Sequence, residues 1–177
     1  MQSTFSEEGP YAHIHPRYQR QDAHWMRQAL LEAKKAAQLG RNPGRGGHRA
    51  GHRSPRLPAP TNRRELDQDA MAHAEVLCIQ QACRVLNSWR LSGCTLYVTL
   101  EPCPMCSGAI INSRLDRVVY GAKDDKAGCA GSVADLFVMP FNHTPVIRSG
   151  ILEEECAAVL SEFFETLRKK PEDFEQN

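Results

Sequence analysis

The chain has 177 residues, of which 41% are hydrophobic and 24% charged, an ordinary composition for one globular domain that buries its own core. A net charge of +1 gives no overall attraction to nucleic acid, and no apolar run is long enough to cross a membrane. The polar first 20 residues lack the apolar centre of a secretory signal. We therefore expect a single cytoplasmic domain over residues 21–170, with a flexible tail at 1–20 and a short tail at 171–177.

The predicted elements alternate between helices and strands. Apolar residues recur at helical spacing after Asp22, a favourable N-cap, and predict a first helix that ends near Gly40. The order continues as a helix over 71–86, a strand over 95–100, a helix over 104–112, a strand over 117–121, an edge strand at 146–147 and a terminal helix over 157–167. Strand, helix and strand in succession form a crossover between parallel strands. This order predicts an α/β domain in which helices flank a sheet.

Residues 41–60 interrupt this pattern. Gly, Pro and Arg dominate the segment, and only Ala50, Leu57 and Ala59 are apolar. Neither a strand nor a helix is predicted there, and a loop of this length is unusual inside a compact domain. Together with Arg63 and Arg64 the segment forms one of two basic clusters, and the other is Arg168-Lys169-Lys170.

The pattern Pro102-Cys103-Pro104-Met105-Cys106 lies where a predicted strand ends and the next helix begins. Two cysteines three positions apart in a first helical turn face the same side, where their thiolates can bind one metal ion. The positive end of the helix dipole favours these thiolates. Taken alone, C-x-x-C is typical of a redox pair, of half a structural zinc site, or of part of a catalytic one. The odd total of seven cysteines argues against a disulfide framework, and the other five are expected to fill the core.

His73-Ala74-Glu75, in the first part of the second predicted helix, supplies a further metal ligand and a carboxylate. Residues two apart on a helix point about 200° apart, so His73 and Glu75 are expected to have different roles. Ligation by His73, Cys103 and Cys106 leaves one tetrahedral position of a zinc ion for water, as in catalytic sites. Zinc lowers the pKa of that water, and Glu75 can move protons. H-x-E followed by P-C-x-x-C is the signature of zinc deaminases.

Between about Ala23 and Leu167 the chain resembles the tRNA-specific adenosine deaminases of the cytidine deaminase superfamily. The similarity lies in His73-Ala74-Glu75, in the run from Leu96 to Ala109, and in the shorter motifs 113–114, 118–122 and 128–132. The resemblance implies a three-layer cytidine deaminase-like fold with one zinc per chain, which deaminates the wobble adenosine of a tRNA anticodon to inosine. It also implies a homodimer and a terminal helix that meets the anticodon stem.

The same resemblance assigns roles to single residues. Glu75 matches the proton shuttle of the family, and Asn62 matches its base-binding asparagine. Asp124 and Asn142 match positions that touch the flipped nucleotide or its neighbours, although Asn142 also suits a simple turn.

Two other functions share these motifs. One is the deamination of a free base or nucleoside such as cytosine or guanine, because the zinc signature occurs across the superfamily. The segment from Gly128 to Ser132 and the terminal helix favour the tRNA branch. The other is a non-catalytic RNA-binding protein with a structural zinc, against which Glu75 argues because a structural site has no use for a shuttle carboxylate.

The resemblance also predicts a β-hairpin in place of residues 41–60, with a first strand that reads like Pro-Val-Gly-Ala-Val-Ile-Val. One set of codons for residues 43–50 translates to that heptapeptide when a single nucleotide is skipped. We therefore hypothesise a reading-frame error that begins before Pro43 and ends before Asn62. An Arg/Gly-rich RNA-binding loop would explain the composition but not this coincidence. Under the frame hypothesis, the first hairpin of the fold is expected to be lost or disordered.

Overall fold

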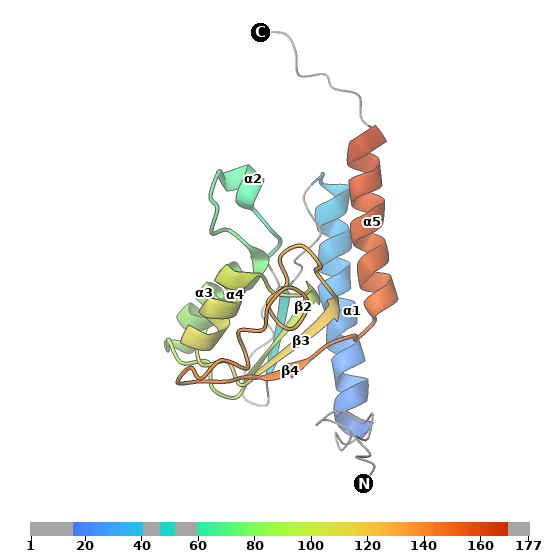
Figure 1. The fold of residues 1–177 in the computed structure, drawn as a ribbon. Helices are drawn as coiled ribbons and strands as arrows, with labels where there is room; N and C mark the ends of the chain where they lie inside the picture. The colour runs from blue at the N-terminus through green and yellow to red at the C-terminus, as the bar shows by residue number, and fades with distance from the viewer. Residues whose placement is uncertain (1–15, 41–46, 52–59, 170–177) are drawn as a thin grey trace.

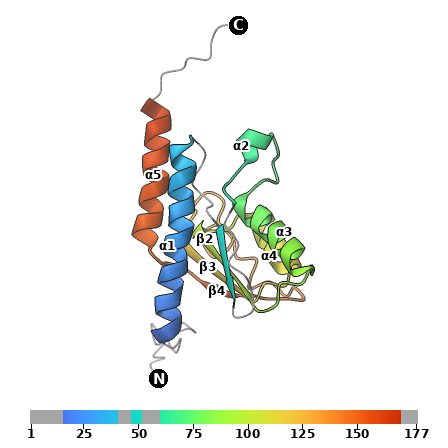
Figure 2. The ribbon, with the colours of Figure 1, turned by 180° about the vertical axis from the view of Figure 1, so that it is seen from behind.

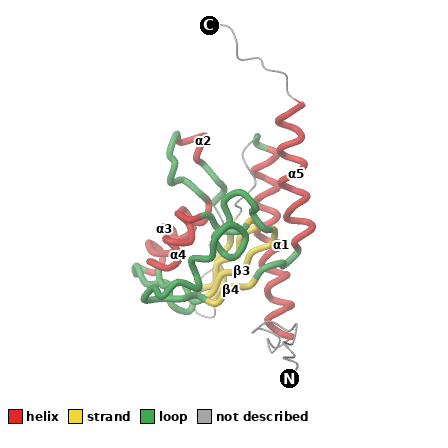
Figure 3. Tube along the Cα trace, viewed as in Figure 1, coloured by secondary structure: helices red, strands yellow, loops and turns green. Residues whose placement is uncertain are grey.

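The computed structural model describes residues 16–40, 47–51 and 60–169, which form one sheet with helices on both faces (Figure 1). The elements in chain order are α1 (Pro16–Gln38), β1 (Gly47–Gly51), α2 (Arg64–Asp67), α3 (Ala74–Leu86), β2 (Cys94–Leu100), α4 (Pro104–Asn112), β3 (Arg117–Ala122), β4 (Val146–Arg148) and α5 (Glu153–Lys169). Figure 3 shows the strands, in yellow, between the helical layers in red. None of the helices in these ranges is long and apolar enough to span a bilayer.

The described strands lie in the order β1-β2-β3-β4. β2, β3 and β4 are parallel, with Thr95 opposite Arg117 and Val118 opposite Ile147, whereas β1 is antiparallel to β2. α4 connects the parallel neighbours β2 and β3. The predicted strand, helix and strand crossover is confirmed, and so is the edge strand near Val146.

Three layers are visible when the ribbon is seen from both sides (Figures 1 and 2). Alternating side chains of β2 face opposite layers, as the two-residue period of a strand requires. Leu96 and Val98 belong to the core that contains buried residues of α3 and α4. Tyr97 between them belongs to the core shared with α1 and α5. The predicted three-layer α/β fold is therefore confirmed.

Helix α1 begins at Pro16, so Asp22 lies inside the helix and not at its N-cap. The Asp22 carboxylate is completely buried and accepts hydrogen bonds from Arg117 at 2.6 and 2.8 Å, from Arg148 at 2.8 Å and from the Tyr97 hydroxyl at 2.9 Å. The predicted cap was wrong because this aspartate pairs with side chains of the sheet. Residues 16–20, expected in the flexible tail, belong to the helix, and proline suits its first turn.

β1 lies within the segment 41–60, where no strand was predicted. It pairs with β2 from Gly47 opposite Val98 to Gly51 opposite Cys94. An antiparallel ladder uses backbone groups that every non-proline residue carries, so the edge of β2 pairs with a sequence of low strand propensity. The expected loss of this strand is therefore corrected. Residues 41–46 and 52–59, which include the rest of the expected hairpin, lie outside the described residues.

Two helix boundaries also differ from the prediction. α3 begins at Ala74 and not at residue 71, because the preceding residues form the short α2 and a turn. α2 was not predicted at all. Its four residues are too few for a periodic apolar pattern, and none of them is buried.

Candidate metal centre and active site

Two helix N-termini meet near the carboxyl end of β2. β2 ends at Leu100, and Cys103 is the N-cap of α4, with Pro104 in the first helical turn. His73 is the N-cap of α3, which packs beside α4. Both cap residues have extended backbones, with φ −76 and ψ 173 at Cys103 and φ −73 and ψ 145 at His73. These caps bring residues 30 positions apart in the sequence into one place.

The three predicted metal ligands are together in the structure. The Nδ1 atom of His73 lies 3.6 Å from the Sγ of Cys103 and 3.5 Å from the Sγ of Cys106. All three ligand atoms lie within 4.8 Å of one another. A tetrahedral zinc ion with bonds of about 2.0 Å to nitrogen and 2.3 Å to sulfur holds those atoms about 3.6 Å apart. The spacing of the three side chains therefore fits zinc and leaves one tetrahedral position for a further ligand.

The cysteines lie in an apolar environment. Cys103 and Cys106 are buried and form a small cluster with Val76, against which Met105 and Ala127 pack. Among the described residues, His73, Cys103 and Cys106 are the group of side chains that could hold a metal ion. Exclusion of water from such a cluster strengthens the electrostatic interactions inside it.

Glu75 lies in the first turn of α3, and its side chain is completely buried. It is not a member of the ligand cluster, although it follows the ligand His73 by only two residues. This agrees with the expected divergence of two such positions on a helix. The positive end of the α3 dipole stabilises a carboxylate at this position.

Asn62 belongs to a segment that pairs with the residues just before His73, eleven positions further along the chain. The backbone N–H of Arg63 donates to the carbonyl of Ala72 at 2.9 Å, so the two segments run side by side there. The Asn62 side chain is buried, and its Oδ1 accepts a hydrogen bond from the N–H of Arg64 at 3.0 Å. This turn fixes the asparagine beside the ligand-bearing end of α3.

Asp124 lies in the loop that follows β3. Its Oδ1 accepts hydrogen bonds from the backbone N–H groups of Lys126 at 3.0 Å and Ala127 at 3.1 Å. Ala127 in turn packs against the cysteine cluster. The carboxylate of Asp124 therefore shapes a loop that contacts the metal centre.

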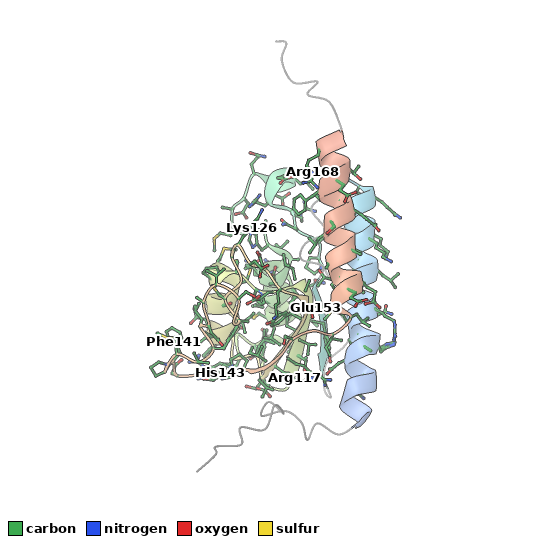
Figure 4. The ribbon with its side chains drawn as sticks, turned by 45° about the vertical axis from the view of Figure 1, so that its right-hand side comes forward. Arg117, Lys126, Phe141, His143, Glu153 and Arg168 are labelled. Carbon is green, nitrogen blue, oxygen red and sulfur yellow. The ribbon has the colours of Figure 1, made fainter. Side chains whose placement is uncertain are left out.

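Asn142 is not brought to the metal centre. It is exposed, and the next residue, His143, has its Nε2 2.6 Å from the carbonyl oxygen of Leu115, just before β3. The metal centre lies at the other end of the parallel strands, and α4, about 13 Å long, runs between the two ends. Figure 4 shows His143, Phe141 and Arg117 at one end of the molecule and Lys126 and Arg168 towards the other.

A shallow groove lies between α5 and the loop after β3. Its lining residues are Lys126, Leu160, Ser161, Phe164, Glu165 and Arg168. Figure 4 shows Lys126 and Arg168 on the same side of the molecule. Of the predicted basic cluster, only Arg168 has a described side chain, whereas Lys170 lies outside the described residues.

Sequence reasoning missed Glu101, which lies between β2 and the C-x-x-C turn. Its side chain is completely buried and accepts hydrogen bonds from the loop after β3. Burial raises the pKa of this carboxyl, but hydrogen bonds from Ser132, Asp124 and Ala130 outweigh burial and hold the pKa below its ordinary value. A charged residue directly after a buried strand was the signal that could have found it.

The remaining cysteines agree with their predicted place in the core. Cys78, Cys94, Cys129 and Cys156 are buried, Cys83 is partly buried, and none of them forms a disulfide. Burial raises the pKa of the Cys129 thiol. Of the seven cysteines only Cys103 and Cys106 belong to the metal cluster.

Comparison with known proteins places the chain in a family. MafB19-like deaminases match residues 20–168. The tRNA-specific adenosine deaminase of Bacillus subtilis (strain 168) is 48% identical over 151 residues, which are 85% of this chain and 92% of the relative.

Solved structures extend the likeness to the fold. One from work on A-to-I editing by tRNA:A34 deaminases at the wobble position of transfer RNA has a TM-score of 0.70 and 38% identity, and the match covers 77% of this chain and 99% of that one. A guanine deaminase from Nitrosomonas europaea shares the fold, with a TM-score of 0.65 and 23% identity over 88% of this chain and 98% of that one. The chain belongs to the tRNA-specific adenosine deaminases, hydrolytic enzymes that act on a C–N bond.

Proposed function

We propose that this chain binds one zinc ion and hydrolyses the wobble adenosine of a tRNA anticodon to inosine and ammonia. The observation that carries the proposal is the spacing of His73, Cys103 and Cys106, which matches a tetrahedral zinc site with one open position. When bound, zinc supplies Lewis-acid activation of a water molecule. A closed structural site would instead need a fourth protein ligand, and none of the described residues joins this cluster as one.

Glu75 is the proposed general acid and base. Hydrolysis places the oxygen of water on C6 of adenine and expels the amino group, so a proton must move from the water to the ring and then to the leaving nitrogen. A buried carboxylate beside the ligand His73, but outside the ligand set, suits that transfer. The burial of Glu75 also keeps bulk water from exchanging the proton.

Asn62 and Asp124 are proposed to contact the flipped nucleotide that is bound at the metal centre of their own chain. Asn62 is held beside His73 by the pairing of Arg63 with Ala72, so its amide suits hydrogen bonding to the edge of a base. Asp124 accepts a hydrogen bond from Ala127, which packs against the cysteine cluster.

The groove beside α5 is the proposed path of the RNA backbone. Lys126 and Arg168 supply positive charge for phosphates, and the half-exposed Phe164, which lines the same groove, supplies a surface for base stacking. A loop of single-stranded nucleotides fits this combination better than a duplex does, because its bases are already unstacked. The same reasoning makes the cytoplasm, where tRNA is decoded, the proposed location.

A homodimer is also proposed. The loop from 133 to 141 exposes Val133, Val138, Met139 and Phe141, an unusual density of large apolar side chains on a surface. Asn142 follows this loop at the end of the sheet that is remote from its own metal centre. A second copy that covers the loop would give Asn142 a route to a nucleotide bound by the partner.

The test is deamination by the full, zinc-loaded chain, measured as ammonia release from every substrate and as inosine formation from adenosine. Substrates are an anticodon stem-loop with adenosine at the wobble position, the same stem-loop with cytidine there, and free adenosine, cytidine and guanine. We expect the adenosine stem-loop to react fastest, and its affinity to fall as salt rises. Faster release of ammonia from guanine or cytidine would refute the tRNA assignment, and a chain that binds the stem-loop with zinc but converts no substrate would support a non-catalytic role.

A further inference from the structure

A single buried carboxylate joins the turn that carries the metal ligands to the loop 123–132. Glu101 directly follows β2 and precedes Cys103 by two positions. Its Oε1 accepts hydrogen bonds from the N–H groups of Ala130 at 2.8 Å and Ser132 at 3.1 Å. Its Oε2 accepts from the N–H of Asp124 at 3.1 Å and from the Ser132 hydroxyl. Glu101 therefore holds the loop close to both of its ends.

The loop is also closed tightly around this carboxylate. The N–H of Cys129 donates to the carbonyl of Pro102 at 2.8 Å, and the N–H of Gly128 donates to the carbonyl of Asp124 at 2.8 Å. A Cβ added at Gly128 would overlap the Glu101 carboxylate and lie 2.6 Å from the carbonyl oxygen of Asp124. The close approach of loop and carboxylate thus requires glycine at this position.

The anchored loop contacts two parts of the proposed active site. Lys126 lines the groove beside α5, and Ala127 packs against the cysteine cluster. Any shift of the loop moves the groove wall relative to the metal centre. The bonds of Glu101, together with the bond from Cys129 to Pro102, hold the groove wall at its distance from the metal centre.

We propose that Glu101 is a positioning residue that fixes where the RNA backbone lies relative to the hydrolytic centre. This inference rests on the proposed function, because it assigns the groove to RNA. Glu101 itself touches neither the substrate nor the metal. It acts through the loop from Asp124 to Ser132, which it anchors and which carries Lys126.

The test compares Glu101→Gln with the parent protein, both as full, zinc-loaded chains acting on the anticodon stem-loop. Glutamine places an NH₂ donor against backbone N–H donors, so one or two of the four hydrogen bonds are lost, because only the Ser132 hydroxyl can turn round and accept. We expect KM for the stem-loop to rise about tenfold while kcat stays within about threefold, with one zinc per chain retained. Asp116→Asn is the matched control, because Asp116 accepts the N–H of Gly93 at 2.7 Å and so anchors a turn at the opposite end of the sheet.

A milder variant and a measurement without substrate complete the design. Ser132→Ala removes the hydroxyl bond and leaves the Glu101 carboxylate in place, so a rise in KM of about threefold is expected. Amide hydrogen exchange at Ala130 and Ser132 should be faster in Glu101→Gln than in the parent.

The outcomes separate this inference from the proposed function. If the parent does not deaminate the stem-loop, the proposed function fails, whatever the variants do. If the parent is active and both variants keep its KM, or if Glu101→Gln loses zinc together with its affinity for RNA, the positioning role is refuted. Amide exchange that is unchanged in a folded Glu101→Gln would refute it as well.

Discussion

The Nδ1 of His73 and the Sγ of Cys103 lie 3.6 Å apart, although the two residues are 30 positions apart in the sequence. Each residue caps a different helix, and no strand or helix contains both. The distance between these two atoms therefore depends on the packing of α3 against α4. At 3.6 Å, the distance shows that this packing suits a shared metal ion.

Removal of one ligand is expected to abolish stable zinc binding. Cys103→Ala leaves only His73 and Cys106, which are too few protein ligands for a stable zinc site. Zinc per chain, measured by elemental analysis after gel filtration, should fall from one to near zero. Cys83→Ala is the control, since Cys83 is a thiol outside the cluster. Equal zinc in Cys103→Ala and the parent would exclude Cys103 from the ligand set.

Glu75→Gln is expected to keep zinc and lose catalysis. Glutamine preserves the shape of the buried side chain but cannot accept and return a proton. The rate of inosine formation should fall by about 10²–10⁴-fold, the usual contribution of a general acid or base. Glu65→Gln, at an exposed position of α2, should react at the parental rate. Parental activity in Glu75→Gln would contradict the proposed role.

Asp22→Asn is expected to destabilise the fold without a specific effect on the active site. The substitution removes the charge that pairs with the partly buried Arg117 and Arg148. Breaking such a buried ion pair costs about 3–5 kcal/mol of unfolding free energy. Urea unfolding measures this loss of stability, and Asp67→Asn is the control. The pair of Asp67 with Arg63 is largely exposed, so its loss should cost about 1 kcal/mol or less.

Stability is expected to fall in alkaline solution. Burial, followed by the charge of Glu155, raises the pKa of the Cys156 thiol from 9.0 to about 12. Burial and then Asp22 also raise the pKa of the Tyr97 hydroxyl. Both groups stay protonated in the folded chain while the unfolded chain releases its protons, so stability is complete below pH 9 and falls as pH rises above it.

The decline should reach about 1.4 kcal/mol per pH unit for each group. Urea unfolding between pH 8 and 10.5 measures it, and Cys156→Ala should make the first part of the curve flatter. A parental curve that is level across this range would contradict the buried state of both groups.

Repair of the first strand is expected to stabilise the sheet. The variant replaces residues 43–49 by Pro-Val-Gly-Ala-Val-Ile-Val, which puts valine at positions 47 and 49, opposite Val98 and Leu96. The side chains of Val98 and Leu96 face the core shared with α3 and α4. Two such pairs of apolar side chains across the strands add on the order of 1–2 kcal/mol in total to the free energy of unfolding. Thermal unfolding and inosine formation should both improve.

The control for this repair replaces the same residues by Pro-Thr-Gly-Ala-Thr-Thr-Thr, which has strand propensity without the apolar side chains. A repaired chain that is neither more stable nor more active than the parent would contradict the reading-frame hypothesis. The Arg/Gly-rich segment would then be a genuine feature of the protein.

Periodicity predicted the elements that bury one regular face. β2, α4 and β3 were predicted to within about one residue, because their apolar patterns and the Pro104 start signal are local. β1 was missed because its sequence, Gly-His-Arg-Ala-Gly, has low strand propensity, and only its pairing with β2 identifies it as a strand. Asp22 was misjudged for a related reason, since its partners Arg117 and Arg148 are distant in the sequence.

The site divides in the same way. His73, Glu75, Cys103 and Cys106 could be predicted because spacing within a helical turn carries their chemistry. The position of Glu101 after a buried strand could have drawn attention to it, but its partners could not be predicted, because its four donors come from a loop more than twenty residues away. The position of Asn142 depends on a contact between the chain before β4 and the chain before β3, for which no short motif exists.

The layered fold separates the two tasks that we assign to the enzyme. The metal ligands come from the ends of α3 and α4, whereas the groove is lined mainly by α5, together with Lys126 of the loop after β3. Mutations in α5 can therefore alter which molecule is bound and leave the hydrolytic residues undisturbed. Such independence would let a lineage exchange one purine-containing substrate for another by small steps, with every intermediate still an active hydrolase.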